Sequence, residues 1–248
     1  MASNSLGRIF RVTTAGESHG AGMGVIIDGC PAGIEIDIAY IQHELDRRRP
    51  GQSSITTQRK EGDKIVIQSG VYQGKSTGAP ILMLIPNEDS RPTDYDQVEQ
   101  AFRPSHADYT YHQKYGTRDH RGGGRSSARE TVNWVAAGAI AKMILHQAGI
   151  KINAAVSSVG SIQVEIPISA FDWEFAEQNP VRCPDPSTSI SMLTLIEETR
   201  DSGDTIRGTV TCVIEGCPAG LGEPGFLTLH GDLGQAMLSI NACKGFEY

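Results

Sequence analysis

The stretch Gly122-Gly123-Gly124-Arg125-Ser126-Ser127-Ala128-Arg129-Glu130 runs from a triple glycine straight into an amphipathic segment. Ser127 and Glu130 fit the capping-box pattern, which predicts a helix that begins at Ser127. The apolar residues that follow have helical spacing over three turns: Val132, Val135, Ala136, Ala139, Ile140, Met143 and Ile144. We therefore expect a helix from Ser127 to about Gln147 that packs on the core through one face.

The start of this helix is a candidate anion site. Its free N–H groups and the positive end of its dipole attract phosphate, and Gly122 to Gly124 let the backbone come close to a ligand. Arg125 and Arg129 add positive charge. The alternative is a flexible glycine loop before an ordinary capped helix, because glycine patterns often arise by chance. This stretch alone leaves both interpretations open.

Charge is distributed unevenly along the chain. The net charge is −7, but residues 103–129 carry six Lys or Arg against two acids, and this basic segment also holds His106, His112 and His120. The acidic total argues against a general nucleic-acid binder. A basic, histidine-rich segment in an acidic protein favours a small anionic ligand in a pocket, with a solvated basic loop as the alternative.

Composition excludes several other classes. The 248 residues suffice for one large or two small domains, and no apolar run approaches the roughly 20 residues that span a membrane. The N-terminus lacks an apolar secretory core, so we expect a cytoplasmic protein with no membrane partner. Five scattered cysteines without a CxxC pair favour free thiols over disulfides or zinc. His106 and His112 lack helical metal-ligand spacing, so no metal site is predicted.

The remaining elements follow from local patterns. Asp37 is the expected N-cap of a helix over 38–49, and Pro50-Gly51 follows its end. A short helix is expected before Pro104. Strands are expected at 11–14, 24–28, 64–69, 80–85, 153–165 and 209–215, and helices at 38–49, 93–102 and 227–240.

One segment occurs twice. Ile27-Asp28-Gly29-Cys30-Pro31-Ala32-Gly33 recurs as Ile214-Glu215-Gly216-Cys217-Pro218-Ala219-Gly220. An apolar strand precedes each copy and a helix-like segment follows it. The separation is too long for a solenoid. It indicates a duplicated strand–turn–helix unit related by an approximate two-fold, with a chance match of two Gly/Pro turns as the alternative.

Two histidines are candidate acids. His19 lies in the turn Gly16-Glu17-Ser18-His19-Gly20, where small neighbours leave its ring accessible, and His106 lies in the basic segment. A histidine titrates near neutral pH and can protonate a leaving oxygen. For His19 the residues alone favour the alternative, a hydrogen-bonding loop histidine. Arg47, Arg48 and Arg49 form a patch able to bind carboxylates or phosphate.

Four motifs carry a resemblance to a known family. They are "GESHGAGMGVIIDGCPAG", "LDRRRPG", "FRPSHADYTYHQKYGTRDHRGGGRSSARET" and "SINACKG". In their order and spacing the chain resembles chorismate synthase over essentially all of its length. The absence of GxSxG, Walker and GxGxxG motifs agrees, because hydrolase, NTPase and Rossmann functions are then disfavoured.

The resemblance implies a fold and a reaction. The fold is α+β: a β-α-β sandwich with helices between two antiparallel sheets and an internal pseudo-two-fold repeat. It would span residues 1–248 as a single domain and assemble as a homotetramer. The reaction is the anti-1,4-elimination of phosphate from 5-enolpyruvylshikimate 3-phosphate to give chorismate, the last step of the shikimate pathway. It requires reduced FMN without net redox change. A bifunctional form would use NADPH, and no separate reductase segment is evident.

The resemblance also assigns residues. His19 matches the general acid near the leaving phosphate, and His106 matches the histidine near the flavin. The run Arg125, Ser126 and Ser127 and the pair Asn241 and Ala242 match flavin contacts. The positions expected to bind substrate or nucleotide phosphate are Arg48, Arg49, Ser54 and Arg129.

The chain departs from the family pattern at three places. Ser54 stands where members often carry an arginine, and Ser105 replaces a common glycine before His106. The family also continues beyond "SINACKG" to an RxD motif, so we expect this chain to be a part of a longer protein.

Three alternatives stay open at this point. They are a flavin-free phosphatase or lyase, an inactive fragment that only binds FMN or substrate, and an RNA-binding module. The last would stack bases on Tyr109, Tyr111 and Tyr115.

Overall fold

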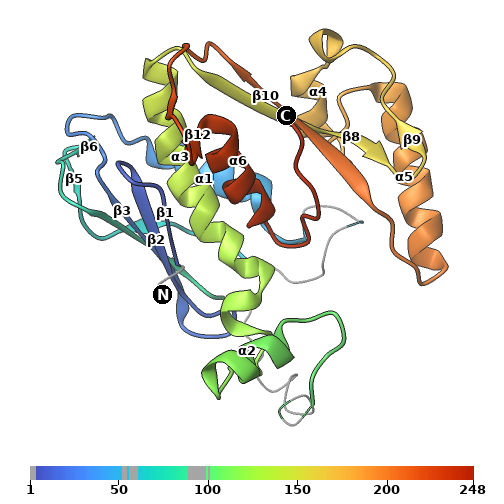
Figure 1. Ribbon diagram of the computed structural model, residues 1–248, viewed down its shortest axis with the longest axis horizontal. Helices are drawn as coiled ribbons and strands as arrows, with labels where there is room; N and C mark the ends of the chain where they lie inside the picture. Colours follow the sequence, from blue (N-terminus) through green and yellow to red (C-terminus); the bar gives the residue numbers. More distant parts are fainter. Residues whose placement is uncertain (1–3, 52–54, 56–60, 89–98, 100) are drawn as a thin grey trace. The chain divides into compact units, whose positions relative to one another are not determined.

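A computed structural model describes residues 4–51, 55, 61–88, 99 and 101–248 (Figure 1). The chain forms two compact units. Unit 1 comprises Met1–Arg49, Arg59–Ile144 and Pro218–Tyr248, and unit 2 comprises Pro50–Gln58 and Leu145–Cys217. The expectation of a single domain stays a prediction, and each unit is described by itself.

Unit 1 is built on a five-stranded antiparallel sheet with strand order β1-β2-β3-β7-β4. The central strands are in register through Thr14↔Val25 and Val25↔Met83. The sheet consists of β1 (Ser5–Leu6), β2 (Arg11–Gly16), β3 (Gly22–Asp28), β4 (Val66–Ile67) and β7 (Ile81–Pro86). The strand expected at 64–69 is thus shorter than predicted, because only Val66 and Ile67 pair with β7.

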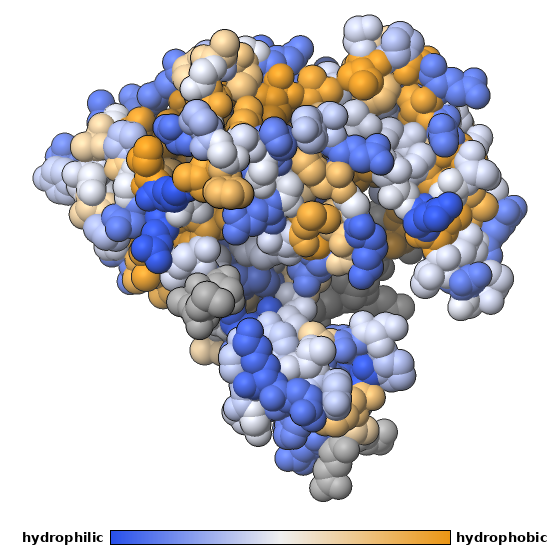
Figure 2. Space-filling view, viewed as in Figure 1, coloured by the Kyte–Doolittle hydropathy of each residue, from blue (hydrophilic) through white to orange (hydrophobic). Residues whose placement is uncertain are grey.

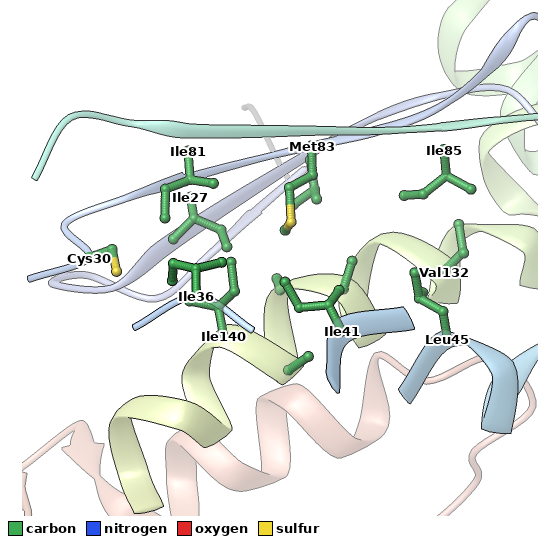
Figure 3. Packing of buried hydrophobic residues seen from close by; sticks show 14 of the residues in the cluster. Ile27, Cys30, Ile36, Ile41, Leu45, Ile81, Met83, Ile85, Val132 and Ile140 are labelled. Carbon is green, nitrogen blue, oxygen red and sulfur yellow. The ribbon is translucent and has the colours of Figure 1, made fainter. Parts of the chain in front are cut away.

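One face of this sheet forms the core of unit 1. Side chains alternate along a strand, so Ile81, Met83 and Ile85 of β7 point to one face. Helices α1 (Ile38–Arg48) and α3 (Thr131–Gln147) cover that face, and Figure 3 shows the strand and helix side chains facing one another. The fully buried members include Ile27, Ile41, Leu45, Ile81, Met83, Ile85, Val132 and Ile140.

Helix α1 begins as predicted. The Asp37 carboxylate accepts a hydrogen bond from the Tyr40 N–H at 3.0 Å, which satisfies one of the free donors of the first turn. The helix ends at Arg48, and Arg49 is its C-cap.

Helix α3 begins one turn later than predicted. Ser127 caps a 3₁₀ turn over Ala128–Glu130, with its Oγ accepting from the Arg129 N–H at 3.3 Å, and the α-helix starts at Thr131. The carboxylate of Glu130 does not complete a capping box: it binds the Arg125 guanidinium and accepts from the side chain of Asn133 at 3.1 Å. A buried ion pair competes here with the local cap.

The other elements of unit 1 are short. Helix α2 (Asp108–Tyr115) was not predicted, and it lies beside the N-terminal end of α3 in Figure 1. The helix expected at 93–102 lies mostly outside the described residues. The remaining elements are β5 (Val71–Tyr72), β6 (Lys75–Ser76), β11 (Gly222–Glu223), β12 (Leu227–Thr228) and α6 (Leu229–Leu238).

Unit 2 has a three-stranded antiparallel sheet with order β10-β8-β9. The strand predicted at 153–165 is two strands, because the chain reverses at Gly160, whose φ is +57°. The elements are β8 (Lys151–Val159), β9 (Ile162–Gln163), β10 (Gly208–Glu215), α4 (Trp173–Gln178) and α5 (Pro186–Asp201). Val159, Val181, Cys183 and Met192 form its core.

The two copies of the repeat share backbone conformation. Gly29 and Gly216 have φ of +79° and +73°, and Gly33 and Gly220 have φ of +86° and +97°. A Cβ on Gly29 would lie 1.8 Å from the Ile9 carbonyl oxygen, and one on Gly216 would lie 2.2 Å from that of Gly149. Both copies thus need glycine for the same reason, close approach of backbone to backbone. The first copy leads to α1 and the second, through β11 and β12, to α6.

Strand pairings among the described residues are all antiparallel, and helices pack on the sheets, so the predicted α+β class is confirmed. Across this part of the chain no helix has the length and apolar character needed to cross a bilayer.

Candidate active site

The triple glycine packs against both candidate histidines. A Cβ on Gly122 would lie 2.2 Å from His19 Cδ2, and one on Gly123 would lie 2.5 Å from His106 Cε1. The φ angles of Gly122 and Gly123 are +65° and +89°, which L side chains rarely adopt. Steric room and backbone conformation both require glycine here. The loop thereby brings residues from distant parts of the sequence into one site.

His19 lies in the loop between β2 and β3, and only 9% of the residue is exposed. Asn87, just after β7, supports this loop. Its Nδ2 donates to the carbonyl oxygens of Glu17 and Gly20, each at 2.9 Å, and lies 3.3 Å from that of Ser18. One amide therefore fixes the backbone on both sides of His19.

His106 precedes helix α2, and a strained residue stands before it. Ser105 has a φ of +60°, the left-handed region that favours glycine. The family-like glycine that Ser105 replaces would adopt this conformation without strain. His106 Nδ1 lies 3.1 Å from Asp108 Oδ1 and 3.2 Å from Arg103 Nη2.

Asp108 is buried and held by Arg103. Arg103 Nε donates to Asp108 Oδ2 at 2.8 Å, and Arg103 Nη2 donates to Oδ1 at 3.0 Å. These hydrogen bonds from Arg103 hold the pKa of Asp108 well below its usual range, although burial opposes them. The carboxylate is thus ionised at any pH at which a histidine titrates.

Arg129 and Arg48 meet a buried carboxylate instead of open solvent. The Arg129 guanidinium binds Asp63 and lies 3.7 Å from the Glu61 carboxylate, and Arg48 Nη1 lies 3.7 Å from Asp63 Oδ2. Arg129 Nε also donates to Asn87 Oδ1 at 3.1 Å. Removing one partner of such a buried pair typically costs about 3–5 kcal/mol. Their predicted contacts with phosphate stay a prediction, and the structure gives both arginines an internal partner.

Of the other two residues predicted to bind phosphate, Arg49 and Ser54, the structure describes Arg49. Arg49 is half-exposed at the end of α1, with its Nη1 3.8 Å from an Asp46 carboxylate oxygen. Ser54 lies outside the described residues.

The predicted flavin contacts come together around the loop. Asn241 Nδ2 donates to the Ser126 carbonyl oxygen at 3.3 Å, and Ser126 Oγ donates to that of Gly123 at 2.7 Å. Ala242 has a φ of +64°, so the chain is strained where it meets this loop. Arg125 donates to Thr14 Oγ1 at 2.8 Å.

A cavity of about 1090 Å³ opens beside the loop. Ligand pockets usually measure about 300–1,000 Å³, so this one has room for more than one small molecule. Figure 2 shows mainly hydrophilic residues on the visible face of the α2 segment, which forms part of its wall. The polar and aromatic residues that line the cavity include Glu17, Asp108, Tyr111, Tyr115, Arg118, His120, Arg121, Arg125 and Ser126.

The positive charge of the basic segment is largely compensated inside the protein. Arg121 pairs with Asp119 at 2.8 Å, and Arg125 pairs with Glu130. Burial and the nearby Asp119 charge raise the pKa of Glu17, whose buried Oε2 has no hydrogen-bond partner among the residues that the structure describes. An anionic ligand would therefore have to share these cations with carboxylates.

Two functional candidates were missed in the sequence, Asn87 and Asp108. Asp108 stands two residues after His106, which is the only signal that could have indicated it. Asn87 contacts residues 67 to 70 positions away, so no local pattern could have found it.

Two imidazoles, basic side chains and a large cavity around a strained glycine loop define an α+β enzyme for small anionic ligands. Comparison with known proteins makes this specific. The sequence model of the family described as chorismate synthase matches residues 10–248. The chain belongs to the chorismate synthase family, which confirms the function that its motifs predicted.

The relatives agree over nearly the whole chain. A chorismate synthase of Cytophaga hutchinsonii is 60% identical over 246 residues, which are 99% of this chain and 68% of the relative. One from Bacteroides thetaiotaomicron is 58% identical, with 99% and 68% covered. A crystal structure of chorismate synthase superposes with a TM-score of 0.79 at 34% identity, covering 96% of this chain and 67% of the other.

The contact between loop and histidine gives a first test. Gly123→Ala is expected to lower turnover by about 100-fold, because the new methyl group must displace the His106 ring, and small misplacements of catalytic groups cost that much. Gly116→Ala is the matched control: its φ is also positive, at +73°, but nothing lies within 4 Å of the added Cβ. Equal activity and equal unfolding temperatures for both variants would contradict a role for the contact.

Proposed function

We propose that this chain carries the residues that eliminate phosphate from 5-enolpyruvylshikimate 3-phosphate to give chorismate, with reduced FMN as cofactor. The observation that carries the proposal is the glycine loop that holds His19 and His106 against one backbone segment at the edge of a large cavity. The reaction class is that of a carbon–oxygen lyase acting on a phosphate ester.

The chemistry matches the residues. His19 would donate a proton to the leaving phosphate oxygen. The protonated phosphate carries one negative charge less and is therefore the better leaving group. The substrate carries two carboxylates and a phosphate, and FMN adds a second phosphate. The basic side chains of the cavity would stabilise these charges, most strongly where water is excluded.

The site fits a flavin. Gly123, Gly124, Arg125 and Ser126 line the large cavity, and Asn241 donates to the Ser126 carbonyl oxygen. We infer that Arg125, Ser126, Ser127, Asn241 and Ala242 hold the cofactor and that His106 keeps a proton close to its ring. Reduced FMN, when bound, supplies electron density to the substrate without net oxidation.

An anaerobic assay tests the proposal. The chain is mixed with 5-enolpyruvylshikimate 3-phosphate and chemically reduced FMN, and chorismate and phosphate are measured together. We expect both products in equal amounts. Binding of FMN and substrate without turnover, also in a form extended at its C-terminus to the length of the relatives, would overturn it. Phosphate release without flavin would indicate a flavin-free phosphatase or lyase instead.

Ser127→Ala tests the placement of the cofactor. Loss of the hydroxyl that caps the 3₁₀ turn is expected to cost about 0.5–2 kcal/mol of stability in any case. We expect the dissociation constant of FMN, measured by fluorescence, to rise several-fold more than that of the substrate. The reverse order would mean that the helix start holds the substrate phosphate.

We also propose a homotetramer. The outer face of the unit 1 sheet exposes Ile26, Val66 and Leu84, each to 40% or more. Apolar side chains grouped on a sheet face are typical of subunit contacts. Light scattering measures the mass in solution directly.

A further inference from the structure

We infer that Asp108 is a positioning residue that fixes the ring of His106 and its tautomer, with the proton on Nδ1. The inference rests on the proposed role of His106 as the histidine that keeps a proton close to the flavin.

The distances place the Asp108 carboxylate next to one nitrogen of the His106 ring, Nδ1. Asp108 Oδ1 lies 3.1 Å from His106 Nδ1, while the opposite edge of the ring, Cε1 and Nε2, faces Gly123. The ring is therefore held between a carboxylate and a backbone loop. Asp108 is almost fully buried, whereas the His106 side chain is 31% exposed. The buried carboxylate can therefore orient the more exposed imidazole.

The carboxylate is itself fixed. Besides its two bonds from the Arg103 guanidinium, Asp108 Oδ2 accepts from the Arg103 backbone N–H at 3.2 Å. Arg118 Nη1 lies 3.9 Å from Asp108 Oδ1 and adds a second cation. Three donors and a nearby cation leave the carboxylate one orientation, with Oδ1 toward the imidazole.

The charges decide which form of the ring is favoured. Asp108 is ionised and can only accept, so a hydrogen bond to it requires a proton on His106 Nδ1. Arg103 Nη2, 3.2 Å from the same nitrogen, can only donate and favours the other neutral tautomer. The carboxylate therefore holds the ring in the tautomer with the proton on Nδ1, in the way that a buried aspartate orients a catalytic histidine elsewhere.

A purely structural role would look different. Asp108 is the first residue of α2 and ties Arg103 and Arg118 together, so its loss would loosen the segment even if His106 were unaffected. The measurement must therefore follow His106 itself.

Asp108→Asn removes the charge and keeps the shape. We follow the His106 ring by ¹⁵N NMR of the full chain without substrate, with the signal assigned by its loss in His106→Ala. We expect the ring proton to move from Nδ1 to Nε2, because Arg103 Nη2, which can only donate, then decides the tautomer. Turnover should fall about 10- to 100-fold, as for partners that orient metal-binding histidines.

Arg118→Lys and Asp108→Glu are the controls. Arg118→Lys removes the side-chain bonds to the carbonyl oxygens of Glu99 and Ala101 but keeps the charge, so it loosens the segment and should leave the tautomer of His106 unchanged. Asp108→Glu keeps a carboxylate and should restore most of the turnover. If Asp108→Asn lowers stability but leaves the tautomer of His106 unchanged, Asp108 is only structural and the inference fails.

A second measurement does not depend on a folded variant. The ¹⁵N shifts of His106 in the unaltered chain report its tautomer, and we expect the proton on Nδ1 at high pH. A proton on Nε2 would overturn the inference. Absence of turnover in the unaltered chain would count against the proposed function alone, because both NMR measurements remain interpretable without activity.

Discussion

His106→Ala is expected to lower turnover by roughly 10²–10⁴-fold, the usual contribution of a group that holds or transfers a proton. The ring packs on Gly123 and pairs with Asp108, yet its side chain is 31% exposed. Removing it leaves the sheet and the helices α1 and α3 untouched, so the unfolding temperature should change little. Steady-state kinetics with reduced FMN, together with thermal unfolding, measure both effects.

His112→Ala is the matched control for this variant. His112 lies in the same basic segment, one turn before the end of α2, and packs against the ring of Phe102 at 5.5 Å instead of the glycine loop. We expect its turnover to stay near that of the unaltered chain. An unchanged turnover number in His106→Ala would end the assignment of His106 to the reaction.

Local sequence patterns predicted the framework of the fold well. The hairpin of β2 and β3, the Asp37 cap and strand β10 depend on neighbouring residues, and each appears where its pattern placed it. Helix α2 was missed because its residues, Asp-Tyr-Thr-Tyr-His-Gln-Lys-Tyr, have no apolar periodicity. Its stability comes from the contacts of the segment with Arg103 and the loop.

Motifs in the sequence predicted which residues belong to the site, but not which residues pair with one another. The two histidines and the glycine loop carry recognisable motifs, and the structure brings them together. The partners of the arginines do not follow from spacing, because Asp63 lies 66 residues before Arg129. Tertiary packing decides such pairs. Some cations of residues 103–129 are therefore paired with carboxylates that a charge count along the sequence could not locate.

The contacts of Asp63 and Arg129 also affect the position of the loop that carries His19. Asp63 binds Arg129, Arg129 donates to Asn87, and Asn87 holds the loop around His19. Arg129, which was first assigned to phosphate, thus also supports the backbone around His19, the proposed acid. Changes at Arg129 would then affect His19 through its loop, which a direct test of His19 must avoid.

His19→Asn is expected to reduce turnover by roughly 10²–10⁴-fold through loss of the proton given to the departing phosphate. Asparagine is preferred to alanine here because His19 is buried, and a smaller side chain would leave a cavity beside Gly122. An acid matters most when the leaving oxygen is most basic. A substrate analogue with a poorer leaving group should therefore lose more activity than the natural substrate.

The comparison of the two substrates separates chemistry from binding. Asn87→Ala serves as the control, because it removes the side chain that braces the carbonyls of Glu17, Ser18 and Gly20 but keeps the imidazole. Because the imidazole remains and can still donate a proton, the difference between the two substrates should be smaller than in His19→Asn. If His19→Asn slows both substrates equally, His19 binds or supports the site and the departing oxygen takes its proton from another group.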